Sequence, residues 1–218
     1  MRSAAVILCL LAGPGLAGCA QAPREAGACH VVSLPGTARP AGETPVLNDA
    51  EAIYAFDCLR APLDLAYAMT GPPYRLWQRV SDPAYTSSHV DARAIVRIYA
   101  DATALPAYGR FEDGGKVPPG GRIAKESLVI DQARTARIGP LFLMEKLPAG
   151  SSPATGDWRY AAWLPNGRLM GDSHPPAGPG AASGPPRGAN MVAACHDCHG
   201  RARRQDSLLY PPPAYRLP

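Results

Sequence analysis

Proline restricts the folds open to this chain more than any other residue, because 25 of its 218 residues are proline and they recur along its length. A proline inside a helix lacks a backbone N–H and collides with the preceding turn, which argues against a bundle of long, uninterrupted helices. Hydrophobic residues make up 46% of the sequence and charged residues 18%, so the chain can bury one sizeable core. We therefore expect a single folded domain with flanking tails.

The charge of the chain says little about its partners. Lys and Arg number 22 and Asp and Glu number 18, which gives a net charge of +4. A charge this small and dispersed does not indicate nucleic-acid binding, and we expect no nucleic-acid partner.

Residues 1–18 have the features of a secretion signal of the lipoprotein type. Arg2 precedes an apolar run over residues 6–11 that is too short to span a bilayer. Residues 16–19, Leu-Ala-Gly-Cys, resemble the lipobox of bacterial lipoproteins, in which the cysteine becomes the acylated N-terminus. We expect Cys19 to carry this lipid anchor, with the mature protein periplasmic and attached to the outer membrane. The alternative is an ordinary cleavage site, which also leads to export.

Export changes how the other cysteines are interpreted, because disulfides persist outside the cytoplasm. Cys29 and Cys58 are predicted to form a structural disulfide. Two unpaired thiols remain the alternative, since spacing in the sequence does not show proximity in space.

The chain divides into a tether and a folded domain. Residues 19–43 are rich in Ala, Gly and Pro without hydrophobic periodicity, which is typical of a flexible tether. Residues 44–218 form the predicted domain. Its first helix is expected over residues 49–59, with Asn48 as its cap and Pro62 limiting its extension, and a second short helix over residues 74–80.

The later part of the domain has strand character. Four segments combine β-branched and aromatic residues with intervening turns, namely residues 94–99, 122–130, 141–147 and 158–164. Residues 171–188 read as a long loop, and residues 190–205 as a terminal helix. The predicted fold class is α+β, an antiparallel sheet with a few helices.

The strongest local motif is Cys195-His196-Asp197-Cys198-His199, a CxxCH run within the predicted terminal helix. Helix positions i, i+3 and i+4 share a face, so two thiols can bond to the vinyl groups of one haem while His199 binds its iron. In an exported protein this pattern predicts a c-type haem. Half of a zinc site and a redox dithiol are the alternatives, but zinc requires four ligands and a thioredoxin-like motif occurs early in its fold.

The position of the motif separates the classes of haem protein. Only 19 residues follow His199, which leaves no room for the haem-wrapping segment of a small class I cytochrome c. The proline-rich body does not supply the four long helices of a cytochrome c′. What remains is a haem held against a β-sheet.

The CxxCH motif and several segments before it resemble those of the cytochrome P-460 family and its relative cytochrome c′-beta. The resemblance covers about residues 72–218 and rests on the segments 74–77, 97–101, 121–126, 156–160 and 195–199, with Asp206. It implies a periplasmic protein, often a homodimer, with the haem against an antiparallel sheet. It also implies that Cys195 and Cys198 attach the haem and that His199 is the proximal iron ligand.

Lys125 occupies the segment in which cytochromes P-460 carry a lysine joined covalently to a meso carbon of the porphyrin. Strand alternation independently places Lys125 on the face of Ile123 and Ser127, where its amine can point into an apolar pocket. Burial would lower its pKa and favour the nucleophilic amine. A solvated lysine on an edge strand is the alternative, and cytochrome c′-beta lacks the bond.

The resemblance also bears on the distal side of the haem, where the P-460 enzymes use a carboxylate as a base. The matching position in this chain is Leu141 or Phe142, an apolar cap like that of cytochrome c′-beta, which admits small gases. Glu145 is the nearest acid, and alternation with Leu141 would bring it near the pocket if that face is distal. Met144 is interpreted as a core residue rather than a sixth ligand.

We therefore expect a monohaem c-type cytochrome that binds nitric oxide or a related small nitrogen species, transfers electrons to a redox partner, or does both. Arg201, Arg203 and Arg204 follow the motif and can dock an acidic partner or form a solvated basic face. One alternative is a haem enzyme that oxidises hydroxylamine or nitric oxide with Lys125 bonded to the haem. The other is a zinc-binding or disulfide-stapled structural lipoprotein.

Overall fold

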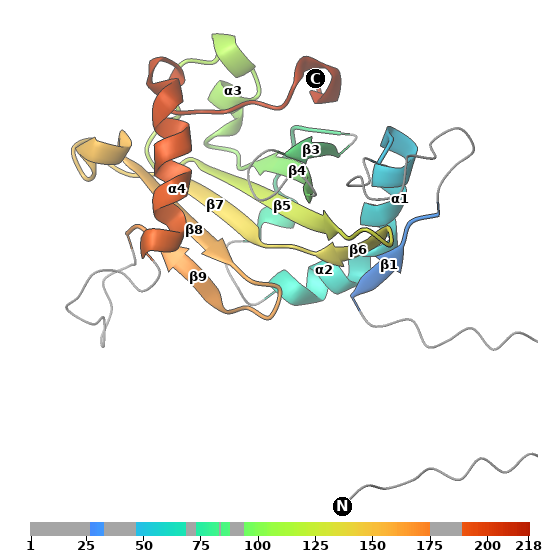
Figure 1. Ribbon diagram of the computed structural model, residues 1–218. Helices are drawn as coiled ribbons and strands as arrows, with labels where there is room; N and C mark the ends of the chain where they lie inside the picture. Colours follow the sequence, from blue (N-terminus) through green and yellow to red (C-terminus); the bar gives the residue numbers. More distant parts are fainter. Residues whose placement is uncertain (1–26, 33–46, 69–72, 83, 88–93, 175–188) are drawn as a thin grey trace, which may run out of the picture.

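The computed structural model describes residues 27–32, 47–68, 73–82, 84–87, 94–174 and 189–218 (Figure 1). The predicted signal, Cys19 and most of the predicted tether lie outside these residues. Across the described ranges, no helix has both the length and the apolar character needed to cross a membrane.

An antiparallel sheet dominates the domain, which confirms the predicted α+β class (Figure 1). Its strand order is β1-β6-β5-β7-β8-β9, and β4 pairs with β5 while also carrying β2 and β3. The strand bounds are β1 (Ala28–His30), β2 (Gln78–Arg79), β3 (Tyr85–Ser87), β4 (Ala94–Ala100), β5 (Arg122–Ile130), β6 (Thr135–Ile138), β7 (Leu141–Lys146), β8 (Trp158–Trp163) and β9 (Leu169–Asp172). The central strand β5 contacts β4, β6 and β7.

Helices cover the sheet from both sides. The α-helices are α1 (Asp49–Cys58), α2 (Arg60–Tyr67), α3 (Leu105–Tyr108) and α4 (Ala189–His199). Short 3-10 helices are η1 (Tyr74–Leu76), η2 (Phe111–Asp113), η3 (Pro153–Thr155), η4 (Gly200–Gln205) and η5 (Pro213–Tyr215). In Figure 1, α4 crosses the sheet near β7, β8 and β9 and continues toward the C-terminal segment.

The alternation of side chains along each strand produces two cores. One face of the sheet packs with α1 and α2 through residues such as Phe56, Leu63 and Leu128. The other face packs with α4 and the C-terminal segment through residues such as Ile123 and Leu208. We call these the network face and the pocket face.

Local signals in the sequence located several elements correctly. α1 begins at a capping box, in which the Asn48 side chain accepts from the Glu51 backbone N–H at 2.9 Å and Glu51 accepts from the Asn48 N–H at 3.0 Å. The strands predicted at residues 94–99, 122–130, 141–147 and 158–164 correspond to β4, β5, β7 and β8.

The helix predicted over residues 49–59 is confirmed as α1, but the helix predicted over residues 74–80 and the role given to Pro62 were wrong. The expected helix over residues 74–80 is one 3-10 turn followed by β2, because Gln78 and Arg79 pair with β4. Pro62 does not end the helical region, since the chain turns at Leu59 and Pro62 lies in the first turn of α2. The missing N–H of a proline costs no helical hydrogen bond at that position.

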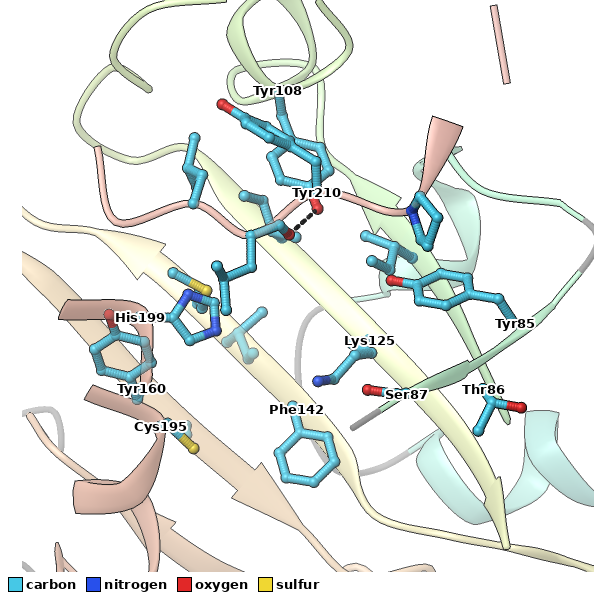
Figure 2. Close-up of a pocket in the computed structure, with 18 residues that line it drawn as sticks. Tyr85, Thr86, Ser87, Tyr108, Lys125, Phe142, Tyr160, Cys195, His199 and Tyr210 are labelled. Atoms are coloured by element: carbon cyan, nitrogen blue, oxygen red, sulfur yellow. Dashed lines mark hydrogen bonds between the residues drawn. The ribbon is translucent and has the colours of Figure 1, made fainter. Parts of the chain in front are cut away.

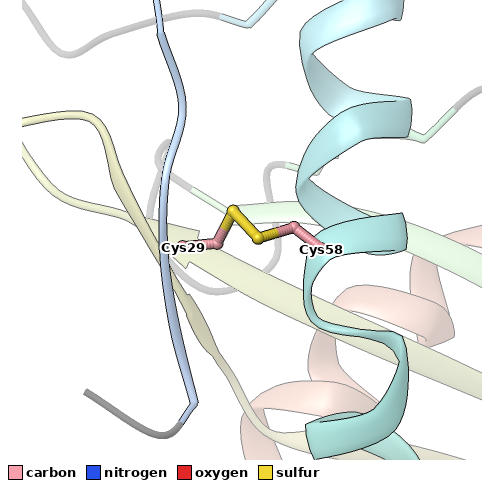
Figure 3. Close-up of a disulfide and its surroundings, with 2 residues drawn as sticks. All are labelled: Cys29 and Cys58. Atoms are coloured by element: carbon pink, nitrogen blue, oxygen red, sulfur yellow. A yellow bond between two sulfur atoms is a disulfide. The ribbon is translucent and has the colours of Figure 1, made fainter. Parts of the chain in front are cut away.

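A disulfide joins Cys29 in β1 to Cys58 at the end of α1, with a Cα–Cα distance of 6.2 Å (Figure 3). β1 in turn pairs with β6, where Cys29 lies opposite Ala136. The prediction of a flexible tether over residues 19–43 is therefore wrong at residues 28–30, which the sheet edge and the disulfide hold in place.

Candidate functional site

A cavity of about 350 Å³ lies between the pocket face of the sheet, helix α4 and the C-terminal segment (Figure 2). Its volume falls within the range typical of small-molecule sites. β4, β5, β7 and β8 supply its apolar floor, α4 supplies Cys195 and His199, and Leu208 to Tyr210 close it from above. The CxxCH motif is thus adjacent to a cavity.

The two motif cysteines are not bonded to each other, and both are partly buried on α4. Cys195 and His199 lie one helical turn apart and both line the cavity. Cys198 does not border it directly, but its thiol is close enough to Lys125 to influence the pKa of that amine. The structure therefore gathers both cysteines, His199 and Lys125 around one side of the pocket.

His199 is buried, and its Nδ1 lies 2.8 Å from the backbone carbonyl of Ser207. Because a carbonyl only accepts, Nδ1 carries the proton and the lone pair of the ring is on Nε2. Burial lowers the pKa of His199 to about 4, the Ser207 hydrogen bond opposes this shift, and the charge of Lys125 adds to it. At neutral pH the ring is neutral, as an iron ligand must be.

Lys125 extends from β5 into the cavity, as Figure 2 shows. In the sheet it lies opposite Ile98 on one side and Phe142 on the other, and its amine is 5.0 Å from the centre of the Phe142 ring. Burial lowers the pKa of the amine to about 8, although Cys195 and Cys198 raise it. None of the hydrogen bonds and ion pairs among the described residues involves this amine.

The register of β7 shows which of the residues predicted for the distal side of the haem face the pocket. Phe142 and Met144 face the pocket, because they lie opposite Lys125 and Ile123 of β5. Leu141 does not face the pocket, since it is buried in the core on the network face. The prediction that Leu141 could contact the cofactor is therefore wrong, whereas Phe142 lies in the pocket wall.

Glu145 also lies away from the pocket. It pairs with Arg159 of β8 at 2.8 Å, in register on the sheet, and does not border the cavity. Among the described residues that line the pocket, none is Asp or Glu. Met144 pairs in register with Tyr160, whose ring packs 5.5 Å from that of His199, so Met144 belongs to the wall beside the imidazole.

Sequence reasoning missed the aromatic and C-terminal parts of the pocket. Tyr85, Tyr108 and Tyr210 come from three distant segments, and the Tyr108 hydroxyl donates to the Leu209 carbonyl at 3.0 Å. The Ser207 carbonyl was missed as well. A main-chain carbonyl leaves no signal in the amino-acid sequence, and the tyrosines converge only through the sheet topology.

The residues around the cavity fit a haem. Two unpaired thiols and a neutral imidazole come from adjacent turns of one helix, and the remaining walls are largely apolar. A zinc site has less support, because no group of three or more His, Cys, Asp or Glu side chains suited to a metal ion occurs in the part of the chain described by the structure.

Comparison with protein families gives an independent result. The family model described as Cytochrome P460 matches residues 72–210, well over half of the chain. A comparison with curated proteins gave no significant match. The matched region contains the CxxCH motif, Lys125, Phe142 and the Ser207 carbonyl, and the family implies a haem cofactor. This chain belongs to the cytochrome P460 family and is a haem-binding cytochrome.

Proposed function

We propose that this protein is an exported monohaem c-type cytochrome that binds nitric oxide or a related small nitrogen species. Cys195 and Cys198 attach the haem, and His199 binds its iron through Nε2. The observation that carries the proposal is the buried His199 ring, oriented by the Ser207 carbonyl at Nδ1 and placed with Cys195 beside the largely apolar cavity.

The proposed attachment needs no oxidant or reductant. Each thiol adds across one vinyl group, so that a sulfur–carbon bond forms and the thiol proton passes to the other vinyl carbon. The three-residue separation of Cys195 and Cys198 places both sulfurs on one face of α4. When bound, a haem would supply an iron centre for ligand binding and electron transfer, and His199 would supply a nitrogen ligand to that iron.

The lining of the pocket favours a binding function over base-catalysed oxidation. A base must lie within hydrogen-bonding reach of the proton that it removes. The described lining contains no carboxylate, and the nearest acid on β7, Glu145, is paired on the network face. Phe142, Ile98 and Ile123 provide an apolar wall suited to a small uncharged ligand.

Attachment can be tested by producing the protein in a host with cytochrome c maturation. We expect the wild type to retain haem after denaturation, with a pyridine haemochrome spectrum of the c type, and the double variant Cys195→Ser, Cys198→Ser to lose it. His196→Ala is the matched control, because His196 lies in the same motif but its Nε2 contacts the Ala154 carbonyl at 2.8 Å. A wild type without covalent haem would contradict the proposal.

Ligand binding is tested by titrating the reduced holoprotein with nitric oxide and recording the Soret band. We expect saturable binding. Phe142→Glu should weaken binding by placing a charge in the wall, whereas Leu141→Met, on the network face, should leave it unchanged. Absence of nitric oxide binding to fully reduced protein would refute this part of the proposal.

Export and anchoring rest on the lipobox alone. We expect the protein to fractionate with the outer membrane, and Cys19→Ala to abolish incorporation of a labelled fatty acid. Labelling that persists in Cys19→Ala would refute lipidation at this residue.

Lys125 favours a second candidate, an enzyme that oxidises hydroxylamine or nitric oxide with this lysine bonded to the haem. Replacing a meso C–H bond by a C–N bond releases two protons and two electrons, which a peroxide could accept while being reduced to water. Mass spectrometry of the digested holoprotein distinguishes the candidates. Haem bound only to the peptide of Cys195 and Cys198 supports the first, and an additional link to the Lys125 peptide supports the second.

A further inference from the structure

The chain makes an unusual turn directly after η4, the 3-10 helix that follows α4. Asp206 (φ 57°, ψ 31°) and Ser207 (φ 59°) are consecutive non-glycine residues in the left-handed region. This conformation is unfavourable for residues with a Cβ atom, although aspartate tolerates it better than most. The turn directs the Ser207 carbonyl back to His199, where it accepts from Nδ1 at 2.8 Å.

Asp206 is held on several sides. Its carboxylate pairs with Lys146 and accepts from the Val117 backbone N–H at 2.9 Å. Its own carbonyl accepts from the indole N–H of Trp158 at 2.8 Å. Only 6% of the Asp206 side chain and 11% of the Lys146 side chain are exposed, so the pair is largely removed from water.

Lys146 connects this turn to the sheet. It ends β7, the strand that also carries Phe142, and its amine donates to the Gly156 carbonyl at 2.9 Å. The same amine lies 4.8 Å from the centre of the Trp158 ring, and Trp158 is fully buried. The side chain and carbonyl of Asp206 are therefore fixed to Val117 and to the ends of β7 and β8, while its backbone N–H bonds to the Ala202 carbonyl of η4.

We propose that Asp206, whose side chain accepts hydrogen bonds from the Val117 N–H and Lys146, is a positioning residue: its left-handed turn holds the Ser207 carbonyl against Nδ1 of His199. The proposal rests on the proposed role of His199 as the iron ligand. A firm hydrogen bond at Nδ1 makes the imidazole a stronger electron donor, which favours ferric iron, and it also fixes the plane of the ring. Lys146 and Asp206 thereby influence the iron without contacting it.

The test compares Asp206→Ala with Asp206→Asn in the holoprotein. Both variants remove the charge, but asparagine still tolerates the left-handed conformation and can accept from the Val117 N–H. We expect Asp206→Ala to weaken the His199 hydrogen bond, lower the iron–histidine stretching frequency of the reduced protein, and shift the redox equilibrium toward ferrous iron about tenfold, or about 59 mV. Asp206→Asn should give a clearly smaller change in both measurements.

Asp157 provides the matched control. It also has a left-handed backbone (φ 62°), and its carboxylate accepts from the backbone N–H groups of Ser152 at 2.7 Å and Gly150 at 3.0 Å. It has no described contact with Ser207 or His199. Asp157→Ala should leave the stretching frequency and the midpoint potential unchanged.

Equal shifts in Asp206→Ala and Asp206→Asn would overturn the proposal, because they would show only the loss of a nearby charge. No shift in either variant would overturn it too. Haem content, measured first, tests the proposed function separately. In haem-free protein the ¹⁵N shifts of the His199 ring test the positioning alone: the proton should stay on Nδ1 in the wild type and in Asp157→Ala, and lose this preference in Asp206→Ala.

Discussion

Lys125 and Glu126 are neighbours on β5, yet their side chains lie on opposite faces of the sheet in contrasting surroundings. On the network face, Glu126 is completely buried and accepts from Tyr74 at 3.0 Å, Tyr99 at 2.7 Å and Arg75 at 2.7 Å. On the pocket face, Lys125 borders the cavity, and its amine lies 5.0 Å from the centre of the Phe142 ring. One strand thus carries a fully partnered charge and a charge without an ionic partner among the described residues.

This difference distinguishes buried charged side chains that stabilise the fold from those that are available for a function. Buried charges that serve the fold are paired and hydrogen-bonded, because an unpartnered charge in the interior is costly. A titratable group that stays unpaired beside a cavity and has a shifted pKa is a candidate for function. The network face therefore holds the domain together, while the pocket face keeps the less stable arrangement that a cofactor site requires.

The largest loss of stability should come from a substitution on the network face. Glu126→Ala leaves two buried phenols and part of the Arg75 interaction without an acceptor, and should lower the free energy of unfolding by about 3–5 kcal/mol. Urea denaturation measures the change. Glu145→Ala, which breaks a partly exposed pair with Arg159 and leaves Arg159 paired with Asp172, is the comparison and should cost about 1 kcal/mol or less.

If Glu126→Ala does not fold, Tyr99→Phe keeps the comparison testable, since it removes one of the donors at a cost of about 1–2 kcal/mol. If Glu126→Ala lowers the free energy of unfolding no more than Glu145→Ala does, the buried network does not stabilise the domain.

The disulfide on the network face should have the next largest effect. Its two cysteines are 29 residues apart, and closing a loop of this length stabilises the folded state by about 3–4 kcal/mol in the chain-entropy account. Cys29→Ser, Cys58→Ser should lose this amount in thermal or urea unfolding, with haem content unchanged. Loss of haem at a temperature where the domain is still folded would show that the two faces are coupled.

On the pocket face, removing the buried charge of Lys125 should raise the free energy of unfolding, whereas removing that of Glu126 lowers it. Because the pKa of Lys125 falls from 10.5 to about 8 on folding, the unfolded chain binds more protons between these values. The stability of haem-free protein should therefore rise with pH across this window, and the penalty should be complete below pH 8. Lys125→Met should be more stable than the wild type at pH 7, by on the order of 2 kcal/mol, and should lack this rise.

Urea midpoints measured from pH 7 to pH 10.5 test the prediction, and the difference between wild type and Lys125→Met cancels the titration of other groups. A Lys125→Met variant that is less stable than the wild type at pH 7 would mean that Lys125 has a structural role like that of Glu126.

The smallest effect is expected at the segment that closes the pocket. Arg216 forms two hydrogen bonds with Glu112, at 2.7 and 2.6 Å, but Glu112 is exposed. Glu112→Gln should reduce global stability by less than about 1 kcal/mol. Hydrogen exchange should reveal faster local opening at residues 208–217, and an unchanged exchange rate there would show that other contacts hold the segment.

Sequence reasoning predicted the elements whose signals are local. Asn48 and Glu51 mark the start of α1, and the alternation of apolar residues marks β4 and β5. It failed for β2 and for the strand at Cys29, because these short segments become strands only by pairing with β4 and β6. It placed Leu141 near the cofactor because the register of β7 relative to β5 decides which of two adjacent residues faces the pocket.

The sequence by itself determined the chemistry of the site: the CxxCH spacing fixes two thiols and an imidazole on adjacent turns of one helix, and a helix has the same geometry in any fold. Only the tertiary structure decided what surrounds these groups. The ion pair of Asp206 with Lys146 and the phenols that reach Glu126 depend on contacts between distant segments, and the turn at Asp206 brings the Ser207 carbonyl back to His199. Such contacts follow from strand register and chain reversal, which no short stretch of sequence specifies.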